Sequence, residues 1–321
     1  MSGGDSWVAD DKIYDVVILG GGPAGLTAAM YAGRAALSVL VLEKAVPGGQ
    51  AMNTWKIGNY PGFPDEIEGP ELSRLLEEHA RRFGAEIEVA EVTGVELAGE
   101  IKTIETIDGP RRGRTVILAT GATPRKLGVP GEEEYAGRGV SYCATCDGAF
   151  FQDQHVAVVG GGDSALDEGY FLTRYASRLT VIHRRNEFRG TKELQERLLG
   201  TGKVDVLFDT VVEEIRGNDM VEELVLRHVK TGETSRLAVN GVFIYVGMNP
   251  ETELFRDQVR CDEYGYVDAG EDTITNVPGV FAAGDVRRKQ IRQLVTATAD
   301  GAVAAMMAEH YLAERRTPAA R

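Results

Sequence analysis

The chain has 321 residues, 43% hydrophobic and 26% charged, which is long enough for two domains with separate cores. Its 49 acidic residues outnumber its 35 basic residues, and this balance argues against nucleic acid and anionic membrane as partners. No apolar run reaches the ~18 residues that a membrane span needs. The polar, acidic segment 1–12 lacks the regions of a signal peptide, so we expect a loose leader on a cytoplasmic protein.

A glycine-rich turn follows the first apolar run. Residues 14–19 predict a buried parallel strand, the sequence GGGPAG comes next, and a helical pattern leads to a second strand that ends at Glu43. This order is that of a βαβ unit with a G-x-G-x-x-G motif. In such a motif the glycines permit the tight turn, the approach of a pyrophosphate and close helix packing; here they are Gly20, Gly22 and Gly25.

A second copy of the same pattern begins near the middle of the chain. Residues 155–159 predict a strand, GGGDSA follows, a helix is expected through Ser177, and the next strand ends at His183. In both copies the end of the second strand lies 23 positions after the first glycine. The positions that match the motif are Gly160, Gly162, Ser164 and Ala165, with alanine replacing the third glycine.

The two copies differ in charge at the end of the second strand. Glu43 ends the first, and its carboxylate can accept hydrogen bonds from ribose hydroxyls but repels a 2′-phosphate. The second continues as HRRNEFR, with Arg184, Arg185 and Arg189, whose guanidinium groups match phosphate oxygens. The first site therefore suits FAD or NAD(H), and the second suits NADPH.

The segments around the second copy predict where the chain passes between domains. A β-rich stretch is expected over 85–107, a crossover strand over 115–120 and a return over 241–252. The sequence GVFAAGD then places Asp285 after a strand and before a long amphipathic helix to about Arg315. An acid behind a tight glycine, facing a helix N-terminus, is a candidate cofactor anchor.

Only three cysteines are present, and two of them form the pair Cys143-Ala144-Thr145-Cys146. Two thiols at this spacing can close a small, strained and easily reduced disulfide ring. Asp147 follows directly and is placed to exchange a proton with a departing thiolate. The lone Cys261 is expected to be an inert small residue.

Taken together, the motifs resemble the low-molecular-weight thioredoxin reductases over nearly the whole chain. The resemblance is carried by GGGPAG, GGQ at 48–50, GRGVSYCATCDG at 137–148, GGGDSA, HRRNEFR and GVFAAGD. It implies an α/β protein with two Rossmann-like three-layer nucleotide-binding domains, one inserted in the other. The implied parts are an FAD-binding domain from 1–123 and 250–321 and an NADPH-binding domain with the redox dithiol at 124–249.

The resemblance also assigns roles to individual residues. In a homodimer that reduces thioredoxin, Cys146 would face the flavin, Cys143 would attack the partner disulfide and Asp147 would be the acid. The residues that would hold FAD are Gly20, Gly22, Gly25, Glu43, Gln50, Asn59, Asp285, Arg292 and Gln293. Those that would hold NADPH are Gly160, Gly162, Ser164, Arg184, Arg185 and Arg189.

The surface around the dithiol departs from the family pattern. Tyr142 stands where a small residue is common, and Ala149 stands where an aromatic residue is frequent. Both positions lie where a thioredoxin would dock. Phe150, Phe151 and Arg138 are candidate docking contacts, although the two phenylalanines are at least as compatible with a core position.

The resemblance further implies that the inserted domain rotates to alternate the dithiol and the nicotinamide at the flavin, with hinges near 121–126 and 246–252. Four alternatives remain open at this point. In the first two, another dithiol protein such as a peroxiredoxin-reducing domain replaces thioredoxin as the substrate, or ferredoxin replaces NADPH as the electron donor. In the other two, the cysteine pair binds structural zinc, or the protein is a non-catalytic nucleotide sensor. Zinc needs four ligands, and the five histidines show no metal spacing.

Overall fold

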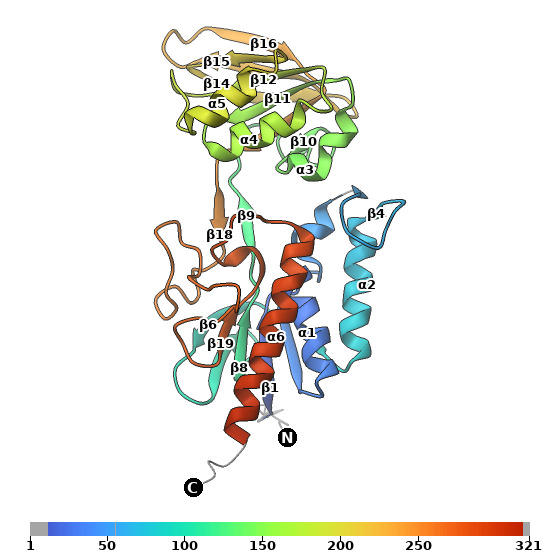
Figure 1. The fold of residues 1–321 in the computed structure, drawn as a ribbon, viewed down its shortest axis with the longest axis vertical. Helices are drawn as coiled ribbons and strands as arrows, with labels where there is room; N and C mark the ends of the chain where they lie inside the picture. Colours follow the sequence, from blue (N-terminus) through green and yellow to red (C-terminus); the bar gives the residue numbers. More distant parts are fainter. Residues whose placement is uncertain (1–11, 55, 317–321) are drawn as a thin grey trace, which may run out of the picture. The chain divides into compact units, whose positions relative to one another are not determined.

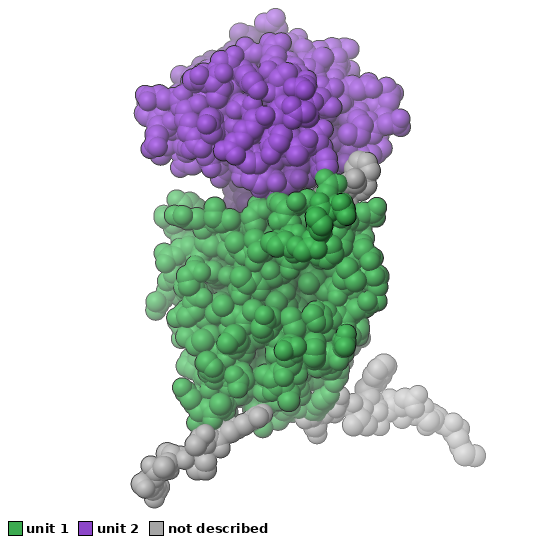
Figure 2. Space-filling view, turned by 45° about the vertical axis from the view of Figure 1, so that its right-hand side comes forward, with its two compact units in different colours: residues 1–123, 250–321 green, residues 124–249 purple. Residues whose placement is uncertain are grey.

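The computed structural model describes residues 12–54 and 56–316, so nearly all of the expected leader lies outside the described residues. The chain forms two compact units, coloured separately in Figure 2. Unit 1 comprises Met1–Thr123 and Pro250–Arg321, and unit 2 comprises Pro124–Asn249. No helix within the described ranges is long and apolar enough to cross a membrane.

The elements of unit 1 come from both ends of the chain, as the blue and red segments of Figure 1 show. In chain order they are β1 (Ile13–Leu19), α1 (Pro23–Arg34), β2 (Val39–Glu43), the 3₁₀ helix η1 (Gly49–Asn53), β3 (Lys56–Ile57), β4 (Ile67–Glu68), α2 (Gly69–Arg82), β5 (Glu86–Val89), β6 (Val92–Glu96), β7 (Lys102–Thr106), β8 (Arg111–Leu118), β19 (Val280–Ala282), the 3₁₀ helix η3 (Gly284–Val286) and α6 (Leu294–Arg316).

The elements of unit 2 are continuous in the chain. They are β10 (Val140–Ser141), α3 (Ala144–Asp147), the 3₁₀ helix η2 (Gly148–Phe151), β11 (His155–Gly160), α4 (Asp163–Leu172), β12 (Arg178–Ile182), α5 (Lys192–Leu199), β13 (Val204–Leu207), β14 (Thr210–Gly217), β15 (Val221–His228), β16 (Thr234–Ala238) and β17 (Gly241–Tyr245). The connecting strands β9 (Ala122–Pro124) and β18 (Met248–Pro250) pair with each other where the chain leaves and re-enters unit 1.

Unit 1 is built on a sheet in which β5, β2, β1, β8 and β19 run parallel. Because side chains alternate along a strand, β1 faces two cores. Val16 and Ile18 pack with α1 and α6 on one face, and Val17 and Leu19 pack with the β6–β7 side on the other. All four side chains are almost completely buried, as a parallel strand covered on both faces requires.

Unit 2 repeats this arrangement with a five-stranded parallel sheet in the order β10-β17-β11-β12-β13. Val156 and Val158 of β11 pack with α4 on one face, while Ala157 and Val159 pack with the antiparallel sheet β14-β15-β16 on the other. The prediction of two Rossmann-like three-layer domains, one inserted in the other, is confirmed.

Two helix boundaries differ from the sequence-based expectation. Helix α4 ends at Leu172 rather than at Ser177, because the Thr173 hydroxyl donates to the Tyr170 carbonyl (2.7 Å) and the next residues form tight turns. Helix α6 begins only at Leu294, so Asp285 lies in the short η3 turn and does not lead directly into the long helix. The predicted amphipathic character of α6 is not confirmed, because the apolar Val295 and Met306 are exposed while the polar Asp300 is buried.

Candidate functional site

The first glycine-rich turn joins β1 to α1 at the carboxyl edge of the unit 1 sheet. Gly20 has φ +105°, and a Cβ there would lie 2.4 Å from the Ala119 carbonyl oxygen. A Cβ on Gly25 would lie 1.9 Å from the Gly20 carbonyl oxygen. Both positions therefore require glycine, for backbone conformation in the first case and for close helix packing in the second.

Glu43 closes this turn from the end of β2. Its Oε2 accepts the Gly21 N–H at 2.7 Å, and the Gly21 carbonyl accepts the Gly48 N–H at 2.8 Å. A Cβ on Gly22 would meet nothing nearer than the Gly49 Cα at 3.8 Å. The N-terminus of α1 is thus left with a glycine backbone that a phosphate group can approach.

The η3 turn and the segment that follows it place two buried polar atoms in unit 1. Asp285 Oδ1 and Arg292 Nε are both buried, and neither has a hydrogen-bond partner among the described residues. Burial raises the pKa of Asp285, and the positive charges of Lys289 and Arg292 oppose that rise. The Arg292 guanidinium lies over the Tyr266 ring, 4.1 Å from its centroid. Buried polar groups of this kind normally have a partner, so this pair can accommodate a polar ligand.

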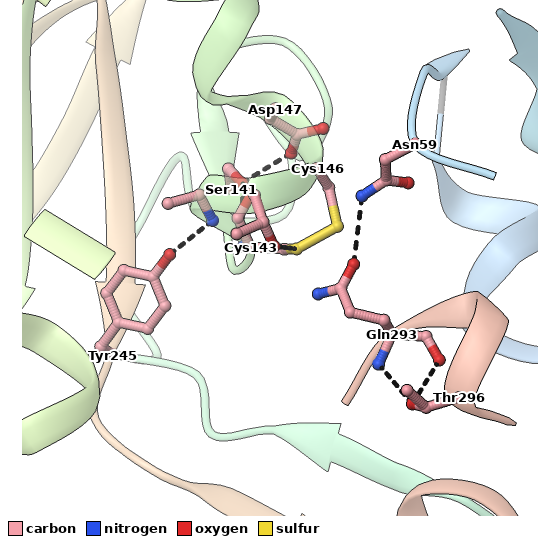
Figure 3. Close-up of a disulfide and its surroundings, with 10 residues drawn as sticks. Asn59, Ser141, Cys143, Cys146, Asp147, Tyr245, Gln293 and Thr296 are labelled. Atoms are coloured by element: carbon pink, nitrogen blue, oxygen red, sulfur yellow. Dashed lines mark hydrogen bonds between the residues drawn. A yellow bond between two sulfur atoms is a disulfide. The ribbon is translucent and has the colours of Figure 1, made fainter. Parts of the chain in front are cut away.

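Three further predicted cofactor residues lie in unit 1. The Asn59 side-chain amide donates to Gln293 Oε1 at 3.1 Å, which joins residues 234 positions apart in the sequence (Figure 3). The Gln293 N–H donates to the Thr296 hydroxyl at 3.1 Å just before α6. Gln50 is exposed in η1, directly after the Gly48–Gly49 segment that lies against the glycine-rich turn.

The second glycine-rich turn joins β11 to α4 in unit 2. Gly160 has φ +154°, and a Cβ there would lie 2.6 Å from the Tyr245 carbonyl oxygen. The Ala165 methyl group fits at the third motif position and is 1% exposed, whereas Ser164 is exposed at the start of α4. Gly162 has space around it, with an Arg189 guanidinium nitrogen 4.0 Å from the position of an added Cβ.

Backbone hydrogen bonds tie the arginine-rich segment to this turn. The Gly161 carbonyl accepts the N–H groups of Arg189 (2.7 Å) and Gly190 (3.1 Å), and Asp163 Oδ1 accepts the Thr191 N–H (2.8 Å). The Arg184, Arg185 and Arg189 side chains are exposed, and within the described part of the chain none of them forms an ion pair with a carboxylate.

His183 takes the position that Glu43 has in unit 1. A Cβ on Gly161 would lie 2.4 Å from the His183 ring, just as one on Gly21 would lie 3.1 Å from the Glu43 Cβ. Burial lowers the pKa of His183, which favours the neutral ring. The second turn therefore faces an uncharged side chain where the first faces a carboxylate.

Cys143 and Cys146 form a disulfide with an S–S distance of 2.07 Å. Cys143 is the N-cap of α3, and its carbonyl accepts the N–H groups of Cys146 (3.3 Å) and Asp147 (3.1 Å). Both cysteines are half-buried. The structure thus pairs the two sulfur atoms that the sequence marks as a dithiol.

Asp147 lies at the end of the same short helix and is held by Ser141 (Figure 3). The Ser141 hydroxyl donates to Asp147 Oδ2 at 2.6 Å and accepts the Cys143 N–H at 3.1 Å. Burial raises the pKa of Asp147, and the Ser141 hydrogen bond opposes the rise. A carboxyl group with a raised pKa beside a disulfide is suited to hold a proton that a thiolate can receive.

Sequence reasoning missed two residues that support the dithiol turn. The Tyr245 hydroxyl accepts the Ala144 N–H at 2.6 Å, and burial raises the pKa of Tyr245 well above its usual range. Glu168 of α4 is half-buried next to α3, and its buried Oε2 has no hydrogen-bond partner among the described residues. Burial raises the pKa of Glu168, and the N–H groups of Thr145 and Ala144 oppose the rise. No local sequence pattern connects these residues with the cysteines.

The side chains around the dithiol divide between core and surface. Tyr142 is half-buried and donates to Glu132 Oε1 at 2.8 Å, so it is turned into unit 2. Phe151 is 6% exposed and packs edge-on against Phe243, whereas Phe150 is 42% exposed. Ala149 and Arg138 are also exposed. Of the two candidate aromatic docking contacts, Phe151 is a core residue and Phe150 is accessible.

The third cysteine and the histidines form no further site within residues 12–54 and 56–316. Cys261 is half-buried against the core of unit 1, and its sulfur lies 3.5 Å from the Val259 carbonyl. Burial raises the pKa of the Cys261 thiol. No group of three or more His, Cys, Asp or Glu side chains in those ranges is arranged to hold a metal ion.

Comparison with known proteins places these features in one group. Residues 14–301 match the model of the pyridine nucleotide-disulphide oxidoreductase family. The thioredoxin reductase of Bacillus subtilis is 48% identical over 308 residues, covering 96% of this chain and 97% of the relative. That of Mycolicibacterium smegmatis is 49% identical, covering 94% and 98%.

Solved structures give the same result. The crystal structure of thioredoxin reductase from Streptococcus pyogenes superposes with a TM-score of 0.90 at 49% identity, covering 94% of this chain and 99% of the other. The enzyme from Giardia duodenalis superposes with a TM-score of 0.89 at 34% identity, covering 94% and 100%.

Proposed function

The chain belongs to the pyridine nucleotide-disulphide oxidoreductases and, within them, to the thioredoxin reductases, and from that premise we propose that it reduces thioredoxin with electrons from NADPH through FAD. In the reaction, NADPH, H⁺ and the thioredoxin disulfide become NADP⁺ and the thioredoxin dithiol. The observation that carries the proposal is the Cys143–Cys146 disulfide beside Asp147, in the same unit as the arginine-flanked glycine turn.

The polar groups of unit 1 fit FAD. The uncrowded Gly22 backbone at the N-terminus of α1 suits a pyrophosphate, and Glu43 is at the edge of the turn where a ribose would lie. Asp285 Oδ1 and Arg292 Nε, buried and unpartnered among the described residues, can bind polar atoms of the cofactor. We assign FAD to Gly20, Gly22, Gly25, Glu43, Gln50, Asn59, Asp285, Arg292 and Gln293.

Unit 2 has the complementary charge for NADPH. Its exposed arginines next to the glycine turn can bind a 2′-phosphate with paired N–H groups, and neutral His183 does not repel it. Glu43 at the equivalent position in unit 1 disfavours the same phosphate. We assign NADPH to Gly160, Gly162, Ser164, Arg184, Arg185 and Arg189.

When bound, FAD would supply a two-electron carrier between the nicotinamide and the disulfide. The side chains of unit 2 then handle the sulfur and proton chemistry. With the pair reduced, the Cys143 thiolate attacks one sulfur of the thioredoxin disulfide and releases the other as a thiolate. The Cys146 thiolate then attacks Cys143 Sγ in the mixed disulfide, which restores the Cys143–Cys146 bond and releases the second thioredoxin thiolate. Asp147, held by Ser141 with a raised pKa, exchanges the proton.

Single cysteine substitutions test this proposal. Cys143→Ser and Cys146→Ser each remove one sulfur of the pair and should abolish thioredoxin reduction. Both variants should keep NADPH-dependent bleaching of the flavin, which needs neither sulfur. The measurement is stopped-flow absorbance of the flavin together with a thioredoxin-coupled assay. Cys261→Ser is the matched control and should retain full activity; undiminished thioredoxin reduction in either pair variant would overturn the scheme.

The electron donor is tested separately. The protein is titrated anaerobically with NADPH and then with NADH. NADPH should reduce the flavin at far lower concentrations than NADH does. Equal response to both nucleotides, or reduction only by ferredoxin, would contradict the assignment of unit 2 to NADPH.

The partner and the assembly complete the proposal. We propose that the protein substrate is thioredoxin and that the enzyme is a homodimer. We also propose that it works in the cytoplasm, where the reducing environment keeps protein thiols reduced. A thioredoxin and a peroxiredoxin-reducing dithiol domain should be compared as substrates in the same assay. Light scattering during gel filtration should give twice the mass of a 34.7 kDa chain.

A further inference from the structure

A buried group of three charged side chains lies between the η3 turn and α6 in unit 1. Asp300 Oδ1 accepts a hydrogen bond from the Arg287 guanidinium at 2.7 Å, and its Oδ2 accepts one from Arg287 Nε at 2.8 Å. Lys289 Nζ donates to the same Oδ2 at 2.8 Å. The three side chains are 3 to 8% exposed, so this ionic cluster is held away from solvent.

Asp300 also binds the backbone of the turn that carries Asp285. Its Oδ2 accepts the Gly284 N–H at 2.9 Å. Gly284 has φ +80°, and a Cβ there would lie 2.9 Å from the Ala24 Cβ at the start of α1. The carboxylate therefore fixes a left-handed turn that packs against the helix whose N-terminus is the proposed phosphate site.

The cluster carries one more positive than negative charge beside an acidic group. Among the buried groups, Arg287 and Lys289 contribute two positive charges and Asp300 one negative charge; the carboxylate of Glu271, which Arg287 also contacts at 3.4 Å, is exposed to solvent. Asp285, whose Oδ1 is buried, lies near them; the charge of Lys289 lowers its pKa and that of Asp300 raises it. Since isolated buried charges are costly, burial raises the pKa of Asp285, and the charge of Lys289 offsets part of that rise.

A buried ionic cluster is weak evidence for stability alone, because well-packed apolar residues often stabilise a fold as well or better. What apolar residues cannot supply is an acceptor for the Gly284 N–H and a cation near Asp285. The geometry of the cluster therefore points to a positioning role rather than to a purely structural one.

We propose that Asp300, with Arg287 and Lys289, is a positioning residue that orients the Gly284–Asp285 turn and sets the charge around Asp285 so that the turn is ready to bind FAD. This inference rests on the proposed function, in which Asp285 holds FAD. Asp300 acts through the turn and the cations, and no direct contact with the cofactor is assigned to it.

The test measures FAD affinity rather than turnover. The full-length protein, purified with its flavin, is diluted in steps, and the free FAD is read from its fluorescence. Asp300→Asn removes the charge and one strong acceptor and should weaken FAD binding by about 10- to 100-fold, as expected when a hydrogen bond to a charged group is lost. The KM for NADPH should not change, because unit 2 is untouched.

Two changes at Lys289 separate charge from packing. Lys289→Met keeps the paired Arg287–Asp300 contacts and should weaken FAD binding by about 3- to 10-fold, because it removes one positive charge. Lys289→Arg keeps that charge, so its FAD affinity should stay within about 2-fold of that of the parent protein. The matched control is Asp268→Asn, which removes an exposed ion pair with Arg288 in the same region and should leave FAD affinity unchanged.

Unchanged FAD affinity in folded Asp300→Asn would overturn the inference. If Asp300→Asn does not fold, the decision falls to Lys289→Met, and unchanged affinity there, or equal loss in Lys289→Arg, overturns it. Failure of the parent protein to bind FAD at all would instead refute the proposed function, so the two failures can be told apart.

Discussion

The two glycine-rich turns share a backbone and differ in the charge that faces it. In both, a glycine at positive φ lies at the end of a buried strand, and the glycine after it lies against the residue that ends β2 or directly follows β12. That residue is Glu43 in unit 1, where it binds the Gly21 N–H, and His183 in unit 2. Steric limits thus set the shape of each turn, and we propose that a few side chains at its edge set which nucleotide it prefers.

The turns also differ in how closely the helix approaches the strand. An added Cβ on Gly25 would lie 1.9 Å from the Gly20 carbonyl oxygen, whereas unit 2 accommodates the Ala165 methyl group at the corresponding position. The same motif therefore tolerates a methyl group in one unit and excludes it in the other.

The largest effect is expected from Gly25→Ala. The new Cβ would meet a backbone oxygen that cannot move without displacing β1 or α1, so the cost should exceed the usual 1–3 kcal/mol of overpacking, at about 4 kcal/mol. Urea unfolding and the flavin content of the purified protein check this. Gly94→Ala, with 3.9 Å of clearance, is the control, and similar losses in both would contradict the steric comparison.

The charge difference is tested by replacing Arg184 and Arg185 with methionine. Each arginine can make charge-assisted hydrogen bonds to a 2′-phosphate, so kcat/KM for NADPH should fall about 1,000-fold while that for NADH changes little. Steady-state kinetics with both donors give the ratio. Arg236→Met, which removes an exposed ion pair with Glu223, should leave both donors unaffected; parallel losses for NADPH and NADH would rule out phosphate recognition.

Asp147 is a feature of unit 2 that has no counterpart in unit 1. Asp147→Asn removes the proton-exchanging group and should lower thioredoxin reduction by about 100-fold, within the usual range for acid–base groups. Flavin reduction by NADPH should persist. Stopped-flow kinetics distinguish the two steps, and full activity of the variant would contradict the assigned role.

The same variant has a predicted pH signature in stability. Because burial raises the folded-state pKa of Asp147, ionisation of the carboxyl group opposes folding. The protonated carboxyl group contributes its full stabilisation below the pKa of about 4 that it has in the unfolded state. That stabilisation is lost as the pH rises through the higher pKa of the folded state. Asp147→Asn should therefore gain stability relative to the parent as the pH rises through this window. Asp219→Asn, at an exposed site, is the control for urea unfolding at each pH.

The smallest effect is expected from Ala165→Gly, which gives unit 2 the third glycine of unit 1. Loss of helix propensity should cost about 1 kcal/mol in the free energy of unfolding. NADPH affinity should change by less than about 3-fold, because the turn keeps its shape. A loss comparable with that of Gly25→Ala would show that the two turns are not equivalent in packing.

The sequence alone determined the features that depend on nearby residues. The spacing of G-x-G-x-x-G between a strand and a helix predicts each turn, since these contacts lie within a few residues of one another. The C-x-x-C pair was predictable for the same reason, because two intervening residues place the sulfur atoms within bonding reach. The 23-residue interval to Glu43 and to His183 also located the side chain that faces each turn.

The distant side chains that contact these sites became visible only in the three-dimensional fold. Tyr245 reaches the Ala144 N–H across 101 residues, and Asn59 meets Gln293 across 234. Asp300, six residues into α6, binds the turn before Asp285, although the sequence suggested only that a helix follows that acid. Such contacts arise from the packing of whole elements against one another, and because no local periodicity encodes them, they become visible only when the sheet and its covering helices are assembled.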